Sequence, residues 1–74
     1  MPKPKSFIIE SRLHVWRAEK RLTQEDLANA VGVTRATILA IEKGNYNPTL
    51  ELVFKLTRYF GVKVEEIFIA KEAK

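Results

Sequence analysis

The sequence predicts a small all-α domain of five short helices, with a short antiparallel two-stranded ribbon formed by the segments on either side of them. Three observations predict this fold. Seventy-four residues can enclose one hydrophobic core but not two. Between residues 11 and 68, apolar residues recur at helical spacing, punctuated by helix-starting threonines and helix-ending glycines. Short β-branched and aromatic runs flank this region at 7–9 and 68–70.

The composition narrows the class of protein. Hydrophobic residues make up 46% of the chain and charged residues 30%, an ordinary globular balance. The net charge of +4 favours a polyanionic partner without identifying it. There is no cysteine and a single histidine, which excludes disulfides, thiolate metal sites and most histidine-based catalysis. We expect a cytoplasmic protein that is not an enzyme, has no metal, cofactor or small-molecule ligand, and does not cross a membrane.

The chain begins with a proline- and lysine-rich segment, predicted to be a flexible basic tail at 1–6, before a single domain at 7–71. Ser11 is placed to cap the first helix, with Leu13 and Trp16 on its buried face.

The next two helices have stronger end signals. Thr23, followed by an aspartate three residues later, predicts a capping box, so the second helix begins at Gln24. Gly32 is placed for a left-handed end to that helix. Thr34 caps a third helix that runs to about Lys43.

Two further helices complete the prediction. Thr49 caps the fourth, which ends at Gly61, and the fifth spans 64–68. Apolar side chains cover about 220° of the fourth helix, more than one edge of a small monomer needs.

Residues 24–43 predict a helix-turn-helix. Ala28 is small enough for two helices to cross closely, and Gly32 allows a tight turn between them. Val33, Ile38 and Ile41 form an apolar wedge beneath the third helix.

These features resemble the Cro/C1-type (Xre) helix-turn-helix family. Four segments carry the resemblance: 22–28 (LTQEDLA), 31–35 (VGVTR), 41–44 (IEKG) and 47–50 (NPTL). The match covers about 11–68, and the length and flanking strands are most similar to the short stand-alone members. The resemblance implies a lambda-repressor-like fold and a homodimeric transcriptional regulator that binds a palindromic operator.

The third helix is predicted to read DNA bases. At about 100° per residue it turns Thr34, Ile38 and Ile41 inward. Outward it turns Ala36, Leu39, Ala40 and Lys43, with Arg35 and Thr37 at the edges. A solvent face of small apolar side chains needs a cover, and a major groove fits: alanines can meet thymine methyls, and Arg35 can pair with guanine. The resemblance assigns base reading to Arg35, Ala36 and Ala40, with Thr37 beside them. Packing of this face against a neighbouring subunit remains the alternative.

Phosphate contacts are predicted on both sides of this helix. Gln24 opens the second helix, where free N–H groups and the dipole favour an anion, and the resemblance assigns its counterpart to phosphate. The alternative is an ordinary first-turn residue. Thr34 precedes the reading helix, and Lys43, Asn45 and Tyr46 follow it, where a loop meets the DNA backbone. Tyr46 suits packing beneath the loop equally well.

Several residues carry structural expectations. The resemblance implies an internal salt bridge between Arg17 and Glu42, the alternative being two solvated charges. Arg21 stands where the family commonly has glycine, and Lys63 replaces the usual small cap of the fifth helix. His14 is expected to be exposed.

The apolar excess predicts a homodimer. The fourth helix and both ribbon segments need a cover, which a second subunit and the domain itself can supply. The predicted interface residues are Phe7, Ile9, Leu52, Leu56, Tyr59 and Ile69. Frayed apolar termini are the alternative.

The sequence therefore predicts a regulator that binds double-stranded DNA sequence-specifically, two reading helices entering successive major grooves about 34 Å apart. Repression by occluding a promoter is the simplest output. The alternative is an antitoxin or adaptor that uses the same fold to bind a protein partner.

Overall fold

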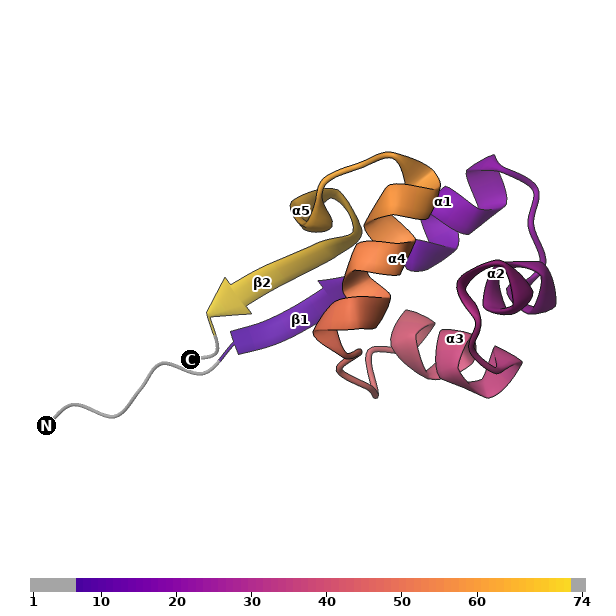
Figure 1. Ribbon diagram of the computed structural model, residues 1–74. Coiled ribbons are helices and arrows are strands. Elements are labelled where there is room, and N and C mark those ends of the chain that lie inside the picture. Colours follow the sequence, from indigo (N-terminus) through magenta and orange to yellow (C-terminus); the bar gives the residue numbers. More distant parts are fainter. Residues whose placement is uncertain (1–6, 73–74) are drawn as a thin grey trace, which may run out of the picture.

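The computed structural model describes residues 7–72, so the predicted flexible tail lies outside the described part. A helical body carries a two-stranded ribbon that projects from one side (Figure 1). In chain order the elements are β1 (Phe7–Ser11), α1 (Leu13–Glu19), α2 (Gln24–Val31), α3 (Arg35–Glu42), α4 (Leu50–Phe60), α5 (Val64–Ile67) and β2 (Phe68–Glu72). The predicted helices and ribbon are present, and the term all-α describes the body but not the strands.

Three helices begin at threonine caps, as predicted. The Thr23 hydroxyl accepts a hydrogen bond from the backbone N–H of Asp26 at 3.0 Å, and the Asp26 carboxylate accepts one from the Thr23 N–H at 2.9 Å. Thr34 and Thr49 cap α3 and α4, accepting from the N–H three residues later at 3.3 and 3.2 Å. These bonds satisfy N–H groups that a helix start leaves without partners.

One helix start differs from the prediction, and another begins at the predicted residue with an incomplete cap. Ser11 ends β1, and α1 begins at Leu13 after Arg12, although the Ser11 hydroxyl still accepts from the Leu13 N–H at 3.2 Å. Lys63 precedes α5 and donates its own N–H to the Glu66 carboxylate at 2.8 Å. A lysine side chain has no acceptor, so only half of a capping box forms there.

The turn after α1 contains an unusual backbone conformation. Arg21 has φ +56°, within the left-handed region that favours glycine. Its N–H donates to the Ala18 carbonyl and the Leu22 N–H to the Arg17 carbonyl, both at 3.0 Å. This pair of bonds is a Schellman motif, so the arginine occupies a glycine-favouring helix end.

One hydrophobic core lies among the five helices. Its buried members are Leu13, Leu27, Ala28, Val31, Ile38, Ile41, Leu52, Leu56, Phe60 and Ile67. Ala28 is buried in α2, which packs on α3, and Val33 packs against this core, as the helix-turn-helix pattern predicts. The prediction that Leu52 and Leu56 face a dimer partner is wrong, because these side chains are 5% and 0% exposed within their own chain.

The ribbon is joined to the body at its base. The Arg12 N–H donates to the Ile67 carbonyl at 2.7 Å, and the indole of Trp16 donates to the Glu66 carbonyl at 2.8 Å, linking α1 to α5. At the far end Phe7 and Ile8 are each 59% exposed. The ribbon therefore packs on its own domain only at its base. The expectation that the domain would also cover the rest of the ribbon is wrong.

Candidate nucleic-acid interface

The outer face of α3 is free of the body. Arg35, Ala36 and Lys43 are exposed and Ala40 is partly exposed, whereas Ile38 and Ile41, on the opposite side, are buried. Figure 1 shows α3 along one edge of the body. The helix therefore presents small side chains outward, a shape that permits close approach to base edges.

The start of α3 fixes two threonines. Thr34 was predicted to turn inward and is exposed, because it stands before the helix as its cap. Its hydroxyl lies 3.1 Å from the Thr37 hydroxyl in addition to accepting the Thr37 N–H. Both hydroxyls are thus engaged locally, and Thr37 is partly exposed.

Arg35 has an uncommitted guanidinium. Within residues 7–72 it forms no ion pair or hydrogen bond through its side chain, and the first turn of α3 contains no acidic residue. A planar fork with free donors beside small apolar groups suits bidentate recognition of guanine.

Three side chains meet where α1, α2 and α3 approach one another. The Arg17 Nε donates to Glu42 Oε2 at 2.7 Å, and its Nη2 donates to Glu42 Oε1 at 3.2 Å. Gln24 Nε2 donates to Glu42 Oε1 at 3.1 Å. The expected salt bridge is present, and its side chains are 21% and 8% exposed, so the alternative of two solvated charges is wrong. The sequence did not predict the Gln24 bond, which joins residues 18 positions apart.

The electrostatics of this cluster favour the ionised forms. Burial of the Glu42 carboxyl opposes ionisation, but hydrogen bonds from Arg17 and Gln24, together with the positive charge of Arg17, outweigh it and hold the pKa of Glu42 below its ordinary value. The hydrogen bond to Glu42 raises the pKa of Arg17. At the α2 start, hydrogen bonds from Thr23 lower the pKa of Asp26. His14, exposed as expected, adds a small lowering influence on Glu42.

The loop after α3 presents the remaining predicted phosphate contacts. Lys43, Asn45 and Tyr46 are all exposed, and Tyr46 keeps 42% of its surface accessible. Tyr46 is therefore not buried beneath the loop. These side chains flank the C-terminal end of α3, whereas Gln24 lies at the start of α2.

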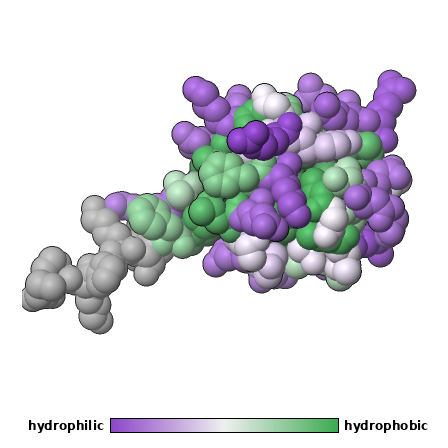
Figure 2. Space-filling model, in the orientation of Figure 1, coloured by the Kyte–Doolittle hydropathy of each residue, from purple (hydrophilic) through white to green (hydrophobic). Residues whose placement is uncertain are grey.

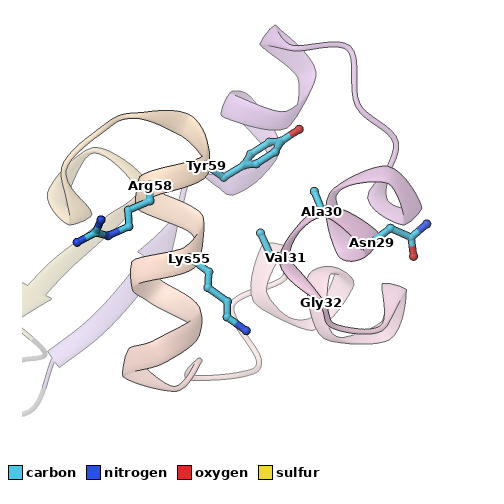
Figure 3. Close-up of a pocket in the computed structure, with 7 residues that line it drawn as sticks. All are labelled: Asn29, Ala30, Val31, Gly32, Lys55, Arg58 and Tyr59. Atoms are coloured by element: carbon cyan, nitrogen blue, oxygen red, sulfur yellow. The ribbon is translucent and has the colours of Figure 1, made fainter.

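A hollow of about 640 Å³ lies between α2 and α4, although the sequence predicted no pocket of plausible ligand size. Its lining residues are Asn29, Ala30, Val31, Gly32, Lys55, Arg58 and Tyr59. In Figure 3, Lys55 and Arg58 extend in different directions from α4, so their charges do not converge on one point. Tyr59, a predicted interface residue, lies here on the α2 side of α4.

The apolar residues that sequence reasoning missed lie elsewhere on α4. Leu50 and Phe54 are 71% and 55% exposed and line a second hollow with Val64 of α5. Val64 also lines a third hollow with Ile9 and Ile69 of the ribbon. We call Leu50, Phe54, Val64, Ile9 and Ile69 the α4–ribbon surface. Figure 2 shows hydrophobic atoms over the ribbon and the adjoining body.

Residues 7–72 contain no cluster of metal ligands and no helix fit to span a membrane. No three His, Asp or Glu side chains gather as metal ligands do. No helix in this range combines the length and apolar character that a membrane span requires.

A helix-turn-helix with an exposed second helix defines a class of DNA-binding protein, and comparison with known proteins gives the family. The chain belongs to the helix-turn-helix family HTH_3, of the Xre or Cro/C1 type, whose model matches residues 13–67. It is a transcriptional regulator with a helix-turn-helix DNA-binding domain and not an enzyme.

Individual relatives agree with this assignment. The chain is 53% identical over 64 residues to an uncharacterized HTH-type transcriptional regulator of Methanocaldococcus jannaschii, covering 86% of this chain and 97% of that protein. It is 42% identical over 60 residues to the cryptic phage CTXphi transcriptional repressor RstR of Vibrio cholerae, covering 81% of this chain and 54% of RstR. The crystal structure of the restriction-modification controller protein C.AhdI from Aeromonas hydrophila is similar, with a TM-score of 0.68 and 33% identity over 74% of this chain and 83% of that one.

Proposed function

We propose that the protein is a sequence-specific repressor that binds a palindromic operator in double-stranded DNA as a homodimer, with α3 in the major groove. The outer face of α3 carries this proposal. It combines an unpaired Arg35 with the small side chains of Ala36 and Ala40, which permit close approach to base edges. The relative RstR is named a transcriptional repressor, which supports repression rather than activation.

In this proposal each predicted side chain contacts either a base or a phosphate of the DNA. Arg35 pairs with a guanine, while Ala36, Thr37 and Ala40 contact neighbouring bases, including thymine methyls. The phosphate contacts are Gln24 and Thr34 on one side, and Lys43, Asn45 and Tyr46 on the other. Phosphate contacts set affinity and register, and the base contacts set sequence preference.

The homodimer is proposed to form through the α4–ribbon surface. Side chains as exposed and apolar as Leu50 and Phe54 are uncommon on a monomer when they adjoin further apolar residues. Of the interface residues predicted from sequence, Phe7, Ile9 and Ile69 lie on the ribbon and remain in the proposal. Tyr59 does not adjoin this surface, and Leu52 and Leu56 are in the core.

Selection from a pool of random duplexes tests the function and identifies the operator in the same experiment. We expect wild-type protein to enrich an inverted repeat, with half-sites about one helical turn apart, that contains a guanine in each half. On that duplex Arg35→Ala should weaken binding by about 10-fold or more, because each good bidentate pair contributes ~1–3 kcal/mol of discrimination.

A matched control is Arg58→Ala, which removes the same charge from α4, away from α3. It should leave the sequence preference unchanged. An equal loss of affinity for the selected duplex in both variants would contradict base reading by α3. So would the absence of any enriched sequence with wild-type protein.

A further inference from the structure

Glu42 lies at the junction between the fold and the proposed DNA-binding face. Its carboxylate accepts hydrogen bonds from Arg17 on α1 and from Gln24 on α2. We infer that Glu42 is a positioning residue for DNA binding, because its bond to the Gln24 amide holds that amide where it meets a phosphate of the duplex. This inference rests on the proposed function and concerns the α2 edge of the same site.

The geometry leaves part of the Gln24 amide available. Gln24 is the first residue of α2 and is partly exposed. Its NH₂ group has two N–H donors; Glu42 Oε1 accepts from this nitrogen at 3.1 Å, which leaves one donor free. A free glutamine side chain samples several rotamers, and ordering it on binding costs entropy. The bond to Glu42 removes part of that cost before DNA arrives.

Neighbouring backbone groups point to the same use. The N–H groups of Thr23 and Asp26 are occupied by the capping box. For the N–H groups of Gln24 and Glu25, no acceptor lies among residues 7–72. The anchored amide therefore lies beside two unsatisfied backbone donors at a helix start.

Arg17 makes the carboxylate compatible with a nearby phosphate. An unpaired Glu42 would repel the DNA backbone, but the guanidinium of Arg17 neutralises it through contacts of 2.7 and 3.2 Å. The Arg17–Glu42 pair has no net charge, and the neutral amide is the group presented outward. Arg17 thus acts on DNA binding through Glu42, and Glu42 acts through Gln24.

A double-mutant cycle separates positioning from structural support. Glu42 is replaced together with Arg17 by methionine, because an apolar pair of similar volume usually preserves the fold where a single replacement strands a charge. This variant is compared with wild type, with Gln24→Ala and with the triple variant. Trp16 fluorescence and circular dichroism establish that each protein is folded under the binding conditions.

Binding is measured with a mixed-sequence duplex of about three helical turns at low salt, because phosphate contacts do not depend on sequence. We expect Gln24→Ala and the Arg17→Met, Glu42→Met variant each to weaken binding by about 3- to 10-fold. The triple variant should bind no more weakly than Gln24→Ala, since without the amide there is nothing for Glu42 to position. Glu51→Met with Lys55→Met removes a surface ion pair of α4 with the same net charge change, and should bind as wild type does.

If the losses of DNA affinity in Gln24→Ala and in the double methionine variant multiply in the triple variant, the two changes act independently. That result would overturn the inference and leave Glu42 a structural residue. Full binding by Gln24→Ala, or by the double methionine variant, would overturn it equally. The Arg35→Ala measurement on the selected operator distinguishes these results from failure of the proposed function itself. If Arg35→Ala retains wild-type preference, base reading by α3 is wrong, whatever the cycle shows.

Discussion

Two charged side chains, those of Arg21 and Glu42, occupy positions that would ordinarily be unfavourable for them. Arg21 holds a left-handed backbone without the freedom of glycine, and it adds a cation to a protein of net charge +4. Glu42 is nearly buried, yet it stays ionised because Arg17 and Gln24 both donate to it. Each position makes a prediction that unfolding measurements can check, with Trp16 as the fluorescent probe.

Arg21→Gly should stabilise the fold. The left-handed conformation costs a side-chain-bearing residue ~1–2 kcal/mol, and the greater chain entropy of glycine offsets part of the relief. We expect the free energy of unfolding in urea to rise by about 0.5–1 kcal/mol.

Lys20→Gly is the matched control for Arg21. Lys20 has φ −90°, which any residue adopts, so glycine relieves nothing there and should lower the free energy of unfolding. A loss of stability in both variants would show that Arg21 is not strained.

Glu42 should contribute to acid destabilisation. Its pKa in the folded protein lies below the ordinary value of 4.5, so folding favours the ionised form. That contribution is complete above the ordinary value and is lost as the pH falls through the lowered folded value. Between about pH 5 and pH 3 the free energy of unfolding should therefore fall more steeply in wild type than in the Arg17→Met, Glu42→Met variant.

Asp26, whose pKa is also lowered, contributes to acid sensitivity in both of these proteins. The difference between their pH profiles therefore isolates Glu42. Parallel profiles would mean that Glu42 gains nothing from its partners in the folded state.

Among the helices and strands, much of the pattern followed from local signals in the sequence. The caps at Thr23, Thr34 and Thr49 and the left-handed Gly32 each depend on residues within one turn, which a sequence displays directly. The ribbon was predicted from two short apolar runs, because each segment alone has little else to stabilise it.

Features that depend on the packing between elements were not predictable in the same way. Apolar side chains surround most of α4, so periodicity did not reveal that Leu52 and Leu56 face the core while Leu50 and Phe54 face outward. The spacing of four between Leu50 and Phe54 was the available signal, since it places them on one face. The bond from Gln24 to Glu42 depends on how α2 and α3 cross, which residue spacing does not define.

The start of α5 can be improved by one substitution. The backbone N–H of residue 63 already donates to the Glu66 carboxylate, which is one half of a capping box. Lys63→Ser would supply the other half, a hydroxyl that accepts from a backbone N–H of the first turn of α5. Complete capping boxes and serine caps typically add ~0.5–1 kcal/mol, so the urea midpoint should rise.

Lys63→Ala is the control, since it removes the lysine without adding an acceptor and should give no gain. Thr49→Ala, which deletes the existing cap of α4, should lower the free energy of unfolding by about 1 kcal/mol. If Lys63→Ser gained no more than Lys63→Ala, the incomplete box would not limit this helix.

In the assembled chain, the proposed DNA-binding face and the α4–ribbon surface belong to different elements. The first is built by α2 and α3, and the second by α4, α5 and the two strands. Separate elements allow the two surfaces to be altered independently. Binding of the proposed palindromic operator would require both at once, because two reading helices must be held one helical turn apart.

Phe54→Glu should therefore strongly weaken the proposed dimer and leave each subunit folded. Phe54 is 55% exposed in α4, so a carboxylate there is solvated in the monomer but becomes desolvated in an apolar interface. We expect the dimer to weaken by about 100-fold or more, which sedimentation at micromolar concentration measures against the 8.5 kDa chain. Affinity for the selected inverted repeat should fall with it, while the preference for each half-site persists. Val15→Glu is the control: it places the same charge at an exposed apolar site on α1 and should stay dimeric. A monomeric wild-type protein, or a Phe54→Glu variant that stays dimeric, would contradict assembly through the α4–ribbon surface.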